Sequence, residues 1–128
     1  MFGSHSKKGT KTDADGLVSN KCSQNLWVYT ADCMPIFFAD KRTRNVATLH
    51  CGRRGLEKKI IKNLVKIFDT FGTSRDDLLV AIGPAISKEN YLVDKITLQE
   101  LNSFSNLYVH KFEMSIFVLV MFSLKSCR

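Results

Sequence analysis

The residues best suited to chemistry lie in a short segment that begins at His50 and ends at Gly55. The segment is predicted to follow a strand and to lead into a long helix. Gly52 and Gly55 permit tight backbone geometry there, the N-terminus of the helix presents unpaired N–H groups, and Arg54 adds a bidentate donor. We therefore interpret the segment as a candidate site for phosphate or a carboxylate.

A second candidate corner contains Cys33, in the stretch from Thr30 to Pro35. Pro35 restrains the chain, and Asp32 is available as a base or as a group that orients a ligand. Zinc favours thiolate and imidazole ligands, and a catalytic zinc usually takes three protein ligands. Cys33 and His50 would supply two of them if neighbouring strands bring them together. The candidates for the third donor are His5, His110 and Cys51.

Other interpretations of the same residues stay open. A lone buried cysteine is more often a small core residue than a ligand, His50 could simply end a strand, and Arg53 and Arg54 could be solvated. Cys33 and His50 could also act as nucleophile and base in a Cys-His hydrolase, which requires a free thiolate. Metal content separates this hydrolase from a zinc enzyme.

Short apolar segments rich in aromatic and β-branched residues predict the strands that position these candidates. The predicted strands are Leu26–Thr30, Pro35–Ala39, Val46–His50 and Leu78–Ile82, the last closed by Gly83–Pro84. From Leu56 to Phe71 apolar residues recur at helical spacing, with lysines on the opposite face, and Gly72 follows where a C-terminal cap is expected.

Weaker signals complete the prediction of elements. Thr73 or Ser74, with the aspartates that follow, predicts a short capped turn. Ser87–Asn90 predicts a turn or helix start, and Ile96–Phe104 a weaker second helix. Strands separated by an amphipathic helix indicate a mixed α/β or α+β fold.

Length, composition and charge limit the number of domains, the kinds of partner and the compartment that we expect. The chain has 128 residues, 45% of them hydrophobic, which suits one domain. The formal charge of +7 comes from scattered basic residues, so we expect small anions as partners and no nucleic acid. The apolar run Met114–Leu124 is shorter than the roughly 20 residues of a membrane span, so no membrane partner is expected. Four cysteines without repeated spacing or a preceding signal peptide favour a reducing cytoplasm.

Several segments, in order, resemble the laccase-domain (YfiH-like) family. Asp15–Ser19 is similar to its acidic-Gly-Leu-Val-Ser segment, Thr30–Pro35 to Thr-Ala-Asp-Cys-x-Pro, and His50–Gly55 to His-Ala-Gly-Trp-Arg-Gly. Ile82–Ile86 matches Ile-Gly-Pro-Ala-Ile, and Tyr91 and Val93 stand at a Tyr-x-Val pair. The opening is rich in Gly, Ser, Lys and Thr with no apolar period, which predicts a flexible arm over 1–14. The resemblance predicts the family domain's N-terminal part over 15–104 and a divergent apolar tail over 105–128.

The resemblance implies a partial version of a four-layer α/β/β/α sandwich and a zinc-dependent purine nucleoside phosphorylase. Such an enzyme cleaves adenosine, inosine or methylthioadenosine with phosphate to the base and ribose 1-phosphate. Adenosine deamination has also been attributed to the family, which was earlier described as copper-dependent polyphenol oxidases. Carried over by position, Cys33 and His50 match two metal ligands and His5 is assigned as the third. Arg54, with Gly52, Gly55 and the helix N-terminus, would hold phosphate, and Asp32 would handle a proton.

Two departures from the family pattern define the alternative. Arg53 replaces the family's tryptophan and Cys51 its alanine, which puts a charge beside the proposed site. Beyond Ser103 the sequence shows none of the family's C-terminal half. The alternative function is therefore a non-catalytic remnant or metal-binding module, with an apolar surface through which copies could associate.

Overall fold

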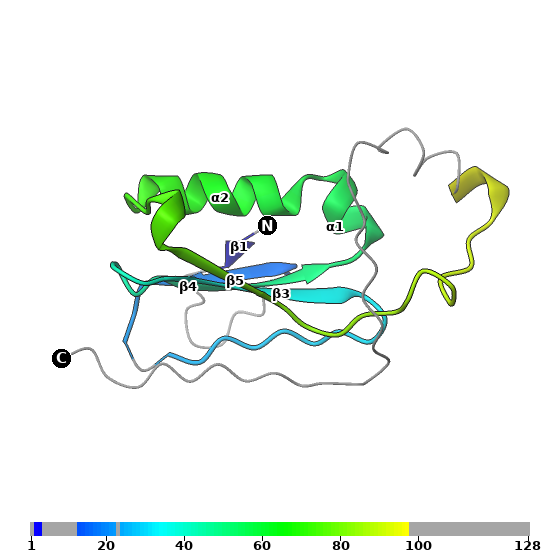
Figure 1. Cartoon of the computed structure of the whole chain (residues 1–128), viewed down its shortest axis with the longest axis horizontal. Coiled ribbons are helices and arrows are strands. Elements are labelled where there is room, and N and C mark those ends of the chain that lie inside the picture. The colour runs from blue at the N-terminus through cyan, green and yellow to red at the C-terminus, as the bar shows by residue number, and fades with distance from the viewer. Residues whose placement is uncertain (1, 4–12, 23, 98–128) are drawn as a thin grey trace.

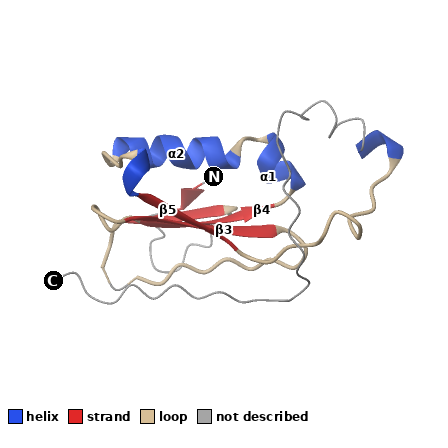
Figure 2. Cartoon of the chain, in the orientation of Figure 1, coloured by secondary structure: helices blue, strands red, loops and turns tan. Residues whose placement is uncertain are grey.

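The computed structural model describes residues 2–3, 13–22 and 24–97. These residues form one five-stranded sheet in the order β1-β2-β4-β3-β5, with helices packed on one of its faces (Figures 1 and 2). The strands are β1 (Phe2–Gly3), β2 (Gly16–Ser19), β3 (Met34–Asp40), β4 (Val46–Cys51) and β5 (Leu78–Ile82). Only the β1–β2 pair is parallel. The mixed sheet and the helices after His50 confirm the predicted α/β class.

β3 and β4 form the central hairpin, and their register decides which side chains share a face. Phe37 is paired with Thr48, and Phe38 with Ala47. Successive side chains of a strand point to opposite faces of the sheet. Phe38 and Ala47 belong to the core beneath the helices, so Phe37 and Thr48 face the other side.

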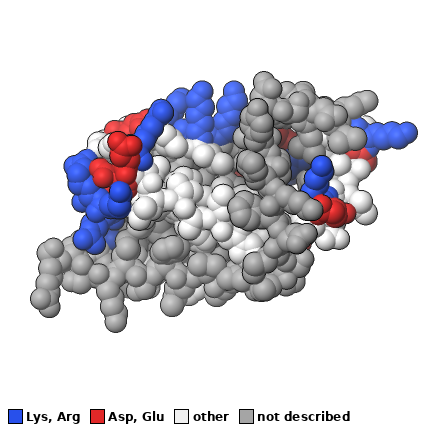
Figure 3. All heavy atoms as spheres, in the orientation of Figure 1, with Lys and Arg blue, Asp and Glu red and all other residues white. Residues whose placement is uncertain are grey.

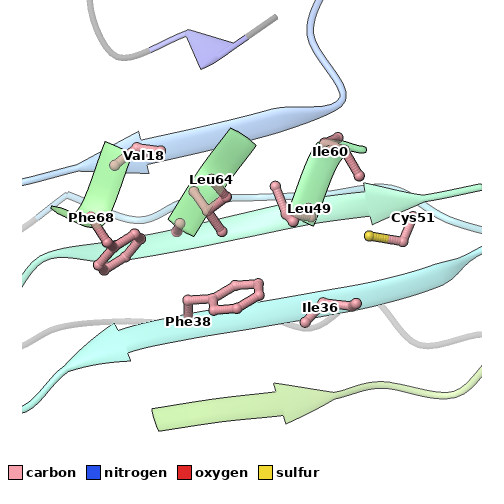
Figure 4. Packing of buried hydrophobic residues seen from close by; sticks show 9 residues of the cluster. Val18, Ile36, Phe38, Leu49, Cys51, Ile60, Leu64 and Phe68 are labelled. Atoms are coloured by element: carbon pink, nitrogen blue, oxygen red, sulfur yellow. The ribbon is translucent and has the colours of Figure 1, made fainter. Parts of the chain in front are cut away.

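The core lies between the sheet and α2 (Ile60–Thr70). Ile60, Leu64 and Phe68 recur at helical spacing and are the buried residues of α2. Leu64 and Leu49 of β4 are both 0% exposed, and the Phe38 and Phe68 rings lie 6.4 Å apart (Figure 4). This packing fixes the helix on the sheet and therefore the strand ends from which the candidate site is built.

The single helix predicted from Leu56 to Phe71 is wrong in one respect, because the structure divides it. α1 spans Arg53–Glu57, and the break before α2 contains Lys59 in the left-handed region, with φ of 56°. Leu56 stays 37% exposed, so the first turn buries little apolar surface. The break turns the chain back over the sheet, which lets the apolar face of α2 meet the strands.

Three of the four predicted strands are confirmed, as β3, β4 and β5. The strand predicted at Leu26–Thr30 is wrong: apart from a single bridge at Leu26, this segment has no strand structure. Trp27 is 45% exposed and Tyr29 76% exposed, so their strand propensity is not supported by packing. Sequence analysis missed β2 as a strand because four residues give too short a pattern.

The predicted cap and turns are largely confirmed. Gly72 has φ of 73°, the left-handed conformation expected after a helix. Residues Arg75–Asp77 form a short 3-10 helix, η1, although its N-cap Ser74 makes no side-chain capping hydrogen bond. At the predicted turn of Ser87–Asn90, the N–H of Asn90 donates to the carbonyl of Ser87 at 3.1 Å.

Some predictions fall partly or wholly outside the described residues. These are most of the 1–14 arm, most of the helix predicted at Ile96–Phe104, and the 105–128 tail with its apolar run. Within the 1–14 arm, the structure describes β1, which pairs with the start of β2. In the described part of the chain, one sheet and one helical layer are present, and none of the helices has the length and apolarity to span a bilayer.

Candidate functional site

The candidate residues meet at one end of the central hairpin. β3 and β4 place Met34 opposite Cys51 and Pro35 opposite His50. Cys33 immediately precedes β3, and Gly52 follows β4 as the N-cap of α1. The antiparallel register therefore brings the two corners singled out in the sequence to the same edge of the sheet.

Gly52 is the point at which the thiol and the imidazole converge. A Cβ added to Gly52 would lie 2.8 Å from Sγ of Cys33 and 3.7 Å from Nε2 of His50. Both atoms therefore face the same small space above the backbone of residue 52. A contact of 2.8 Å is shorter than real Cβ atoms tolerate, so glycine is required if the thiol is to keep its position. The structure thus brings Cys33 and His50 together as predicted.

The Cys33 thiol lies in an acidic, partly buried environment. Burial raises its pKa, and the carboxylates of Asp32 and Asp15 raise it further. Burial and the carboxylates together disfavour a free thiolate, whereas the two carboxylates favour a bound cation, to which a coordinated thiol gives up its proton. The electrostatics of this corner suit a metal ligand better than a nucleophile.

Asp15 is a site residue that the sequence analysis did not select. Its carbonyl accepts a hydrogen bond from the N–H of His50 at 2.7 Å, which ties the segment before β2 to the end of β4. Its carboxylate also raises the pKa of both Cys33 and Cys51. Asp15 could have been selected from the sequence, because the Asp15–Ser19 segment begins with an acidic residue in the family pattern too.

Cys51 is directed away from the site, into the core. It is 3% exposed and packs with Ile36, Leu49 and Ile60 beneath the helices (Figure 4). Burial, with smaller contributions from Cys33 and Asp15, raises the pKa of its thiol to about 12. Adjacent strand residues face opposite sides, so Cys51 is poorly placed to join His50 as the third metal ligand.

A third corner, the turn after β5, closes the site from the β3 side. The N–H of Gly83 donates to the carbonyl of Pro35 at 2.9 Å, and the N–H of Ile86 donates to the carbonyl of Asp32 at 2.9 Å. A Cβ on Gly83 would lie 2.7 Å from Cγ of Pro35, so this close approach also requires glycine. The Asp32 side chain remains exposed beside Cys33.

The two arginines after Gly52 have different environments. Arg53 forms an ion pair with Glu57 one turn along α1, Nη1 to Oε1 2.9 Å, and its charge lowers the pKa of Asp94 after larger effects of Thr97. Arg54 is exposed, and in residues 13–22 and 24–97 no group forms a hydrogen bond or ion pair with its guanidinium. Arg54 is therefore the arginine available to an anion.

The remaining parts of the predicted phosphate site are less favourable. Gly55 packs closely on β4, because a Cβ there would lie 3.4 Å from the carbonyl oxygen of His50. α1 has only five residues, too few to build much of a helix dipole. The anion-binding prediction therefore depends mainly on Arg54 and on the backbone near Gly52.

The third predicted metal ligand, His5, lies outside the described residues, as does His110. Within the described ranges, no group of three or more His, Cys, Asp or Glu side chains is arranged to hold a metal ion. Of the three predicted metal ligands, Cys33 and His50 are therefore the two that the structure describes.

Comparisons with known proteins agree with the motifs at this edge. The family model described as multi-copper polyphenol oxidoreductase laccase matches residues 3–117. A purine nucleoside phosphorylase of Synechocystis sp. is 40% identical over 85 residues, which cover 66% of this chain and 32% of that protein. A purine nucleoside phosphorylase of Borreliella burgdorferi is 34% identical over 94 residues, 73% of this chain and 41% of that protein.

Solved structures show the same fold. YlmD from Geobacillus stearothermophilus is similar with a TM-score of 0.65 and 33% identity, covering 71% of this chain and 34% of that one. The Neisseria meningitidis protein NMB0706 gives a TM-score of 0.65 and 28% identity, covering 77% of this chain and 39% of that one. The chain therefore spans between about a third and two fifths of the length of these relatives.

Proposed function

This chain belongs to the multi-copper polyphenol oxidoreductase laccase family, and from that premise we propose that it is a zinc-dependent purine nucleoside phosphorylase. Its reaction would transfer the ribosyl group of adenosine, inosine or methylthioadenosine from the base to phosphate. The products would be the free base and ribose 1-phosphate. The purine nucleoside phosphorylases among its relatives support the substrate class.

The convergence of Cys33 and His50 on Gly52 is the observation that carries this proposal. A thiol and an imidazole that both lie within 4 Å of the position a Cβ would take at Gly52 form a donor pair that suits zinc, and copper is the family's other metal. When bound, zinc supplies Lewis-acid polarisation of a substrate oxygen. The nearby carboxylates of Asp15 and Asp32 would offset part of its charge.

His5 is our proposed third ligand, because His5 and Ser6 resemble the His-Ser pair that precedes the Asp15–Ser19 segment in the family. β1 begins at Phe2, which pairs with Gly16, and Gly16 in turn pairs with Leu49, next to His50. Three residues of chain span at most about 10 Å. Phe2 lies level with the end of the sheet that holds His50, and β1 runs parallel to β2 away from that end, so the chain after Gly3 would have to turn back to bring His5 to the site.

The side chains around this pair have separable roles in the proposal. Arg54 would bind phosphate through its two parallel N–H groups, held at the site edge by α1. Asp32 is exposed beside the thiol, where its carboxylate could accept or return a proton at the substrate. Gly52 leaves the space that the reacting groups would occupy.

The Cys-His hydrolase is less well supported by the same geometry. A nucleophilic cysteine needs a lowered pKa, usually from a cationic neighbour. Here burial and two carboxylates raise the pKa of Cys33. We therefore retain the metal-dependent phosphorylase as the preferred function.

A second candidate, a non-catalytic metal-binding module, is favoured by one observation. The match covers 32% of the length of the Synechocystis relative, so the comparison reaches only part of a chain that is named for this activity. A module of this kind would bind zinc at Cys33 and His50 without turning over nucleosides.

The test is incubation of zinc-quantified protein with adenosine and phosphate, followed by chromatography of adenine and inosine. The phosphorylase predicts adenine that depends on phosphate; inosine would indicate deamination. Bound zinc without either product would favour the module.

Two variants, Cys33→Ser and His50→Ala, provide the metal control, with Cys51→Ser as the matched cysteine variant on the core face. Zinc content should fall in the first two and persist in the third. Undiminished zinc in both Cys33→Ser and His50→Ala protein would refute the metal site.

A further inference from the structure

The face of the sheet opposite α2 carries an apolar groove. The groove has a volume of about 220 Å³ and is lined by residues that include Leu26, Phe37, Val46, Thr48, Leu79 and Ala81. The register places Phe37, Thr48 and Ala81 on the same face, away from the helices. An engineered cavity of roughly 150 Å³ already takes benzene, so this groove has room for apolar side chains.

Thr48 gives the groove an unmet polar requirement. It is 2% exposed, and no described residue forms a hydrogen bond with its hydroxyl. A buried hydroxyl without a partner is destabilising, and an occupant with a backbone N–H or carbonyl would satisfy it. The groove therefore suits an occupant that is apolar in its side chains and polar in its backbone, as an extended peptide is.

The edge strand next to the groove is apolar as well. β5 pairs with β3 on one side only within the described part of the sheet. Leu79, on the groove face, is 54% exposed, and Val80 and Ile82, on the opposite face, are 52% and 55% exposed. Figure 3 shows an uncharged area over this strand, between charged side chains to either side. Proteins usually cover such edges or protect them with charge.

We propose that the apolar run Met114–Leu124 of this same chain docks in the groove and over Leu79, the exposed side chain of β5 on the groove face. The run has eleven residues with no charged side chain and is bounded by Glu113 and Lys125. Its Ile, Val and Phe residues favour extended structure. The run thus has apolar side chains that fit the groove and backbone groups that can form a hydrogen bond with the hydroxyl of Thr48.

The connection between the two is long enough. Sixteen residues separate Thr97, the last described residue, from Met114. Fully extended, these sixteen residues reach about 50 Å. A folded chain of 128 residues has a radius of gyration of only about 14 Å, so the linker can reach any part of the domain. A tethered segment also has an effective concentration in the millimolar range, so it outcompetes the same segment of a second copy at micromolar protein.

Photo-cross-linking of the full chain tests this docking. Benzoylphenylalanine replaces Leu79, and a mixture of isotopically light and heavy protein is irradiated and digested with trypsin. We expect the residue 79 peptide joined to the peptide of residues 112–125, with both from the same copy. Joining only between light and heavy copies would show that a second copy fills the groove, and absence of the 112–125 peptide would overturn the docking. Benzoylphenylalanine at Lys66, on the exposed side of α2, is the matched control and should not capture that peptide.

A charge in the run provides the second measurement. Val118→Asp should speed amide hydrogen exchange in β5 about tenfold, because the segment leaves the groove. Ser126→Asp, outside the run, should leave exchange unchanged. Equal exchange in wild-type and Val118→Asp protein would contradict the proposal. If Val118→Asp does not fold, Val118→Ala in the cross-linking experiment replaces it, with a lower yield expected.

Discussion

The two ends of the β3–β4 hairpin differ in what they do with polar side chains. At the turn end, Asp40 is 2% exposed, and hydrogen bonds from the chain around it satisfy its carboxylate. At the other end, Cys33 and His50 are partly buried, and neither is hydrogen-bonded through its side chain to a described residue. The same two strands thus carry a structural network at one end and available donors at the other.

The Asp40 network explains why that end is structural. The backbone N–H groups of Arg42 and Thr43 donate to Oδ1 at 2.7 and 2.9 Å, and the hydroxyl of Thr73 donates to Oδ2. Burial acts to raise the pKa of Asp40, but these hydrogen bonds outweigh it and hold the pKa well below its ordinary value of 3.8. The carboxylate therefore joins the hairpin turn to the end of α2.

The difference between the two ends of the hairpin indicates which polar side chains are available to bind a ligand. Polar groups that have all their partners within the fold stabilise it, whereas groups left without partners in a half-buried corner are available to a ligand. Asp40 ends the strand that Cys33 precedes, yet only Cys33 remains available. Four substitutions test this contrast.

Gly52→Ala should have the largest effect. The new Cβ would meet Sγ of Cys33 at 2.8 Å, and the thiol can escape by rotating away from His50. We expect zinc affinity to fall on the order of 100-fold while the midpoint of urea unfolding changes little. Competition with a chromophoric chelator measures the affinity. Unchanged affinity would show that the thiol does not bind metal from its present position.

Asp40→Asn should lower the melting temperature by several degrees at pH 7 and leave zinc affinity unchanged. The folded-state pKa of Asp40 is depressed, so its contribution to stability is complete above the ordinary pKa and is lost as the pH falls through the folded pKa. Wild-type protein should therefore lose stability below about pH 4, and the variant should lose less. Melting curves from pH 7 to pH 2 measure both; parallel pH profiles would refute this role of Asp40.

Gly72→Ala should destabilise the fold by about 1 kcal/mol, because its φ of 73° disfavours any Cβ-bearing residue. No atom lies within 4 Å of the added Cβ, so the cost is conformational. Urea unfolding measures it. Since Gly72 belongs to the structural end, a loss of zinc affinity in this variant would break the separation between the two ends.

Arg53→Gln should have the smallest effect. The ion pair with Glu57 spans one helical turn, and such pairs contribute about 0.5 kcal/mol. A double-mutant cycle with Glu57→Gln, read by urea unfolding, isolates the pair. A coupling above about 1 kcal/mol would mean that this charge, which stands in place of the family's tryptophan, is a major stabilising feature of the site.

Several elements could be predicted because their signals are local. β5 was predicted with its observed bounds, since an apolar run is closed by Gly83 and Pro84. The apolar spacing of Ile60, Leu64 and Phe68 predicted the face of α2 that meets the sheet. Leu26–Thr30 failed because aromatic residues form a strand only when a partner strand is beside them.

The sequence by itself determined the family and the identity of two candidate ligands, since residue types and their order carry that information. The tertiary structure decided which other residues lie beside those two candidate ligands and which point away from them. It directed Cys51 into the core, paired Arg53 with Glu57 and left Arg54 exposed, and added Asp15 through its contact with His50. These outcomes depend on strand register and on the break before α2, which pack residues distant in sequence and leave no local pattern.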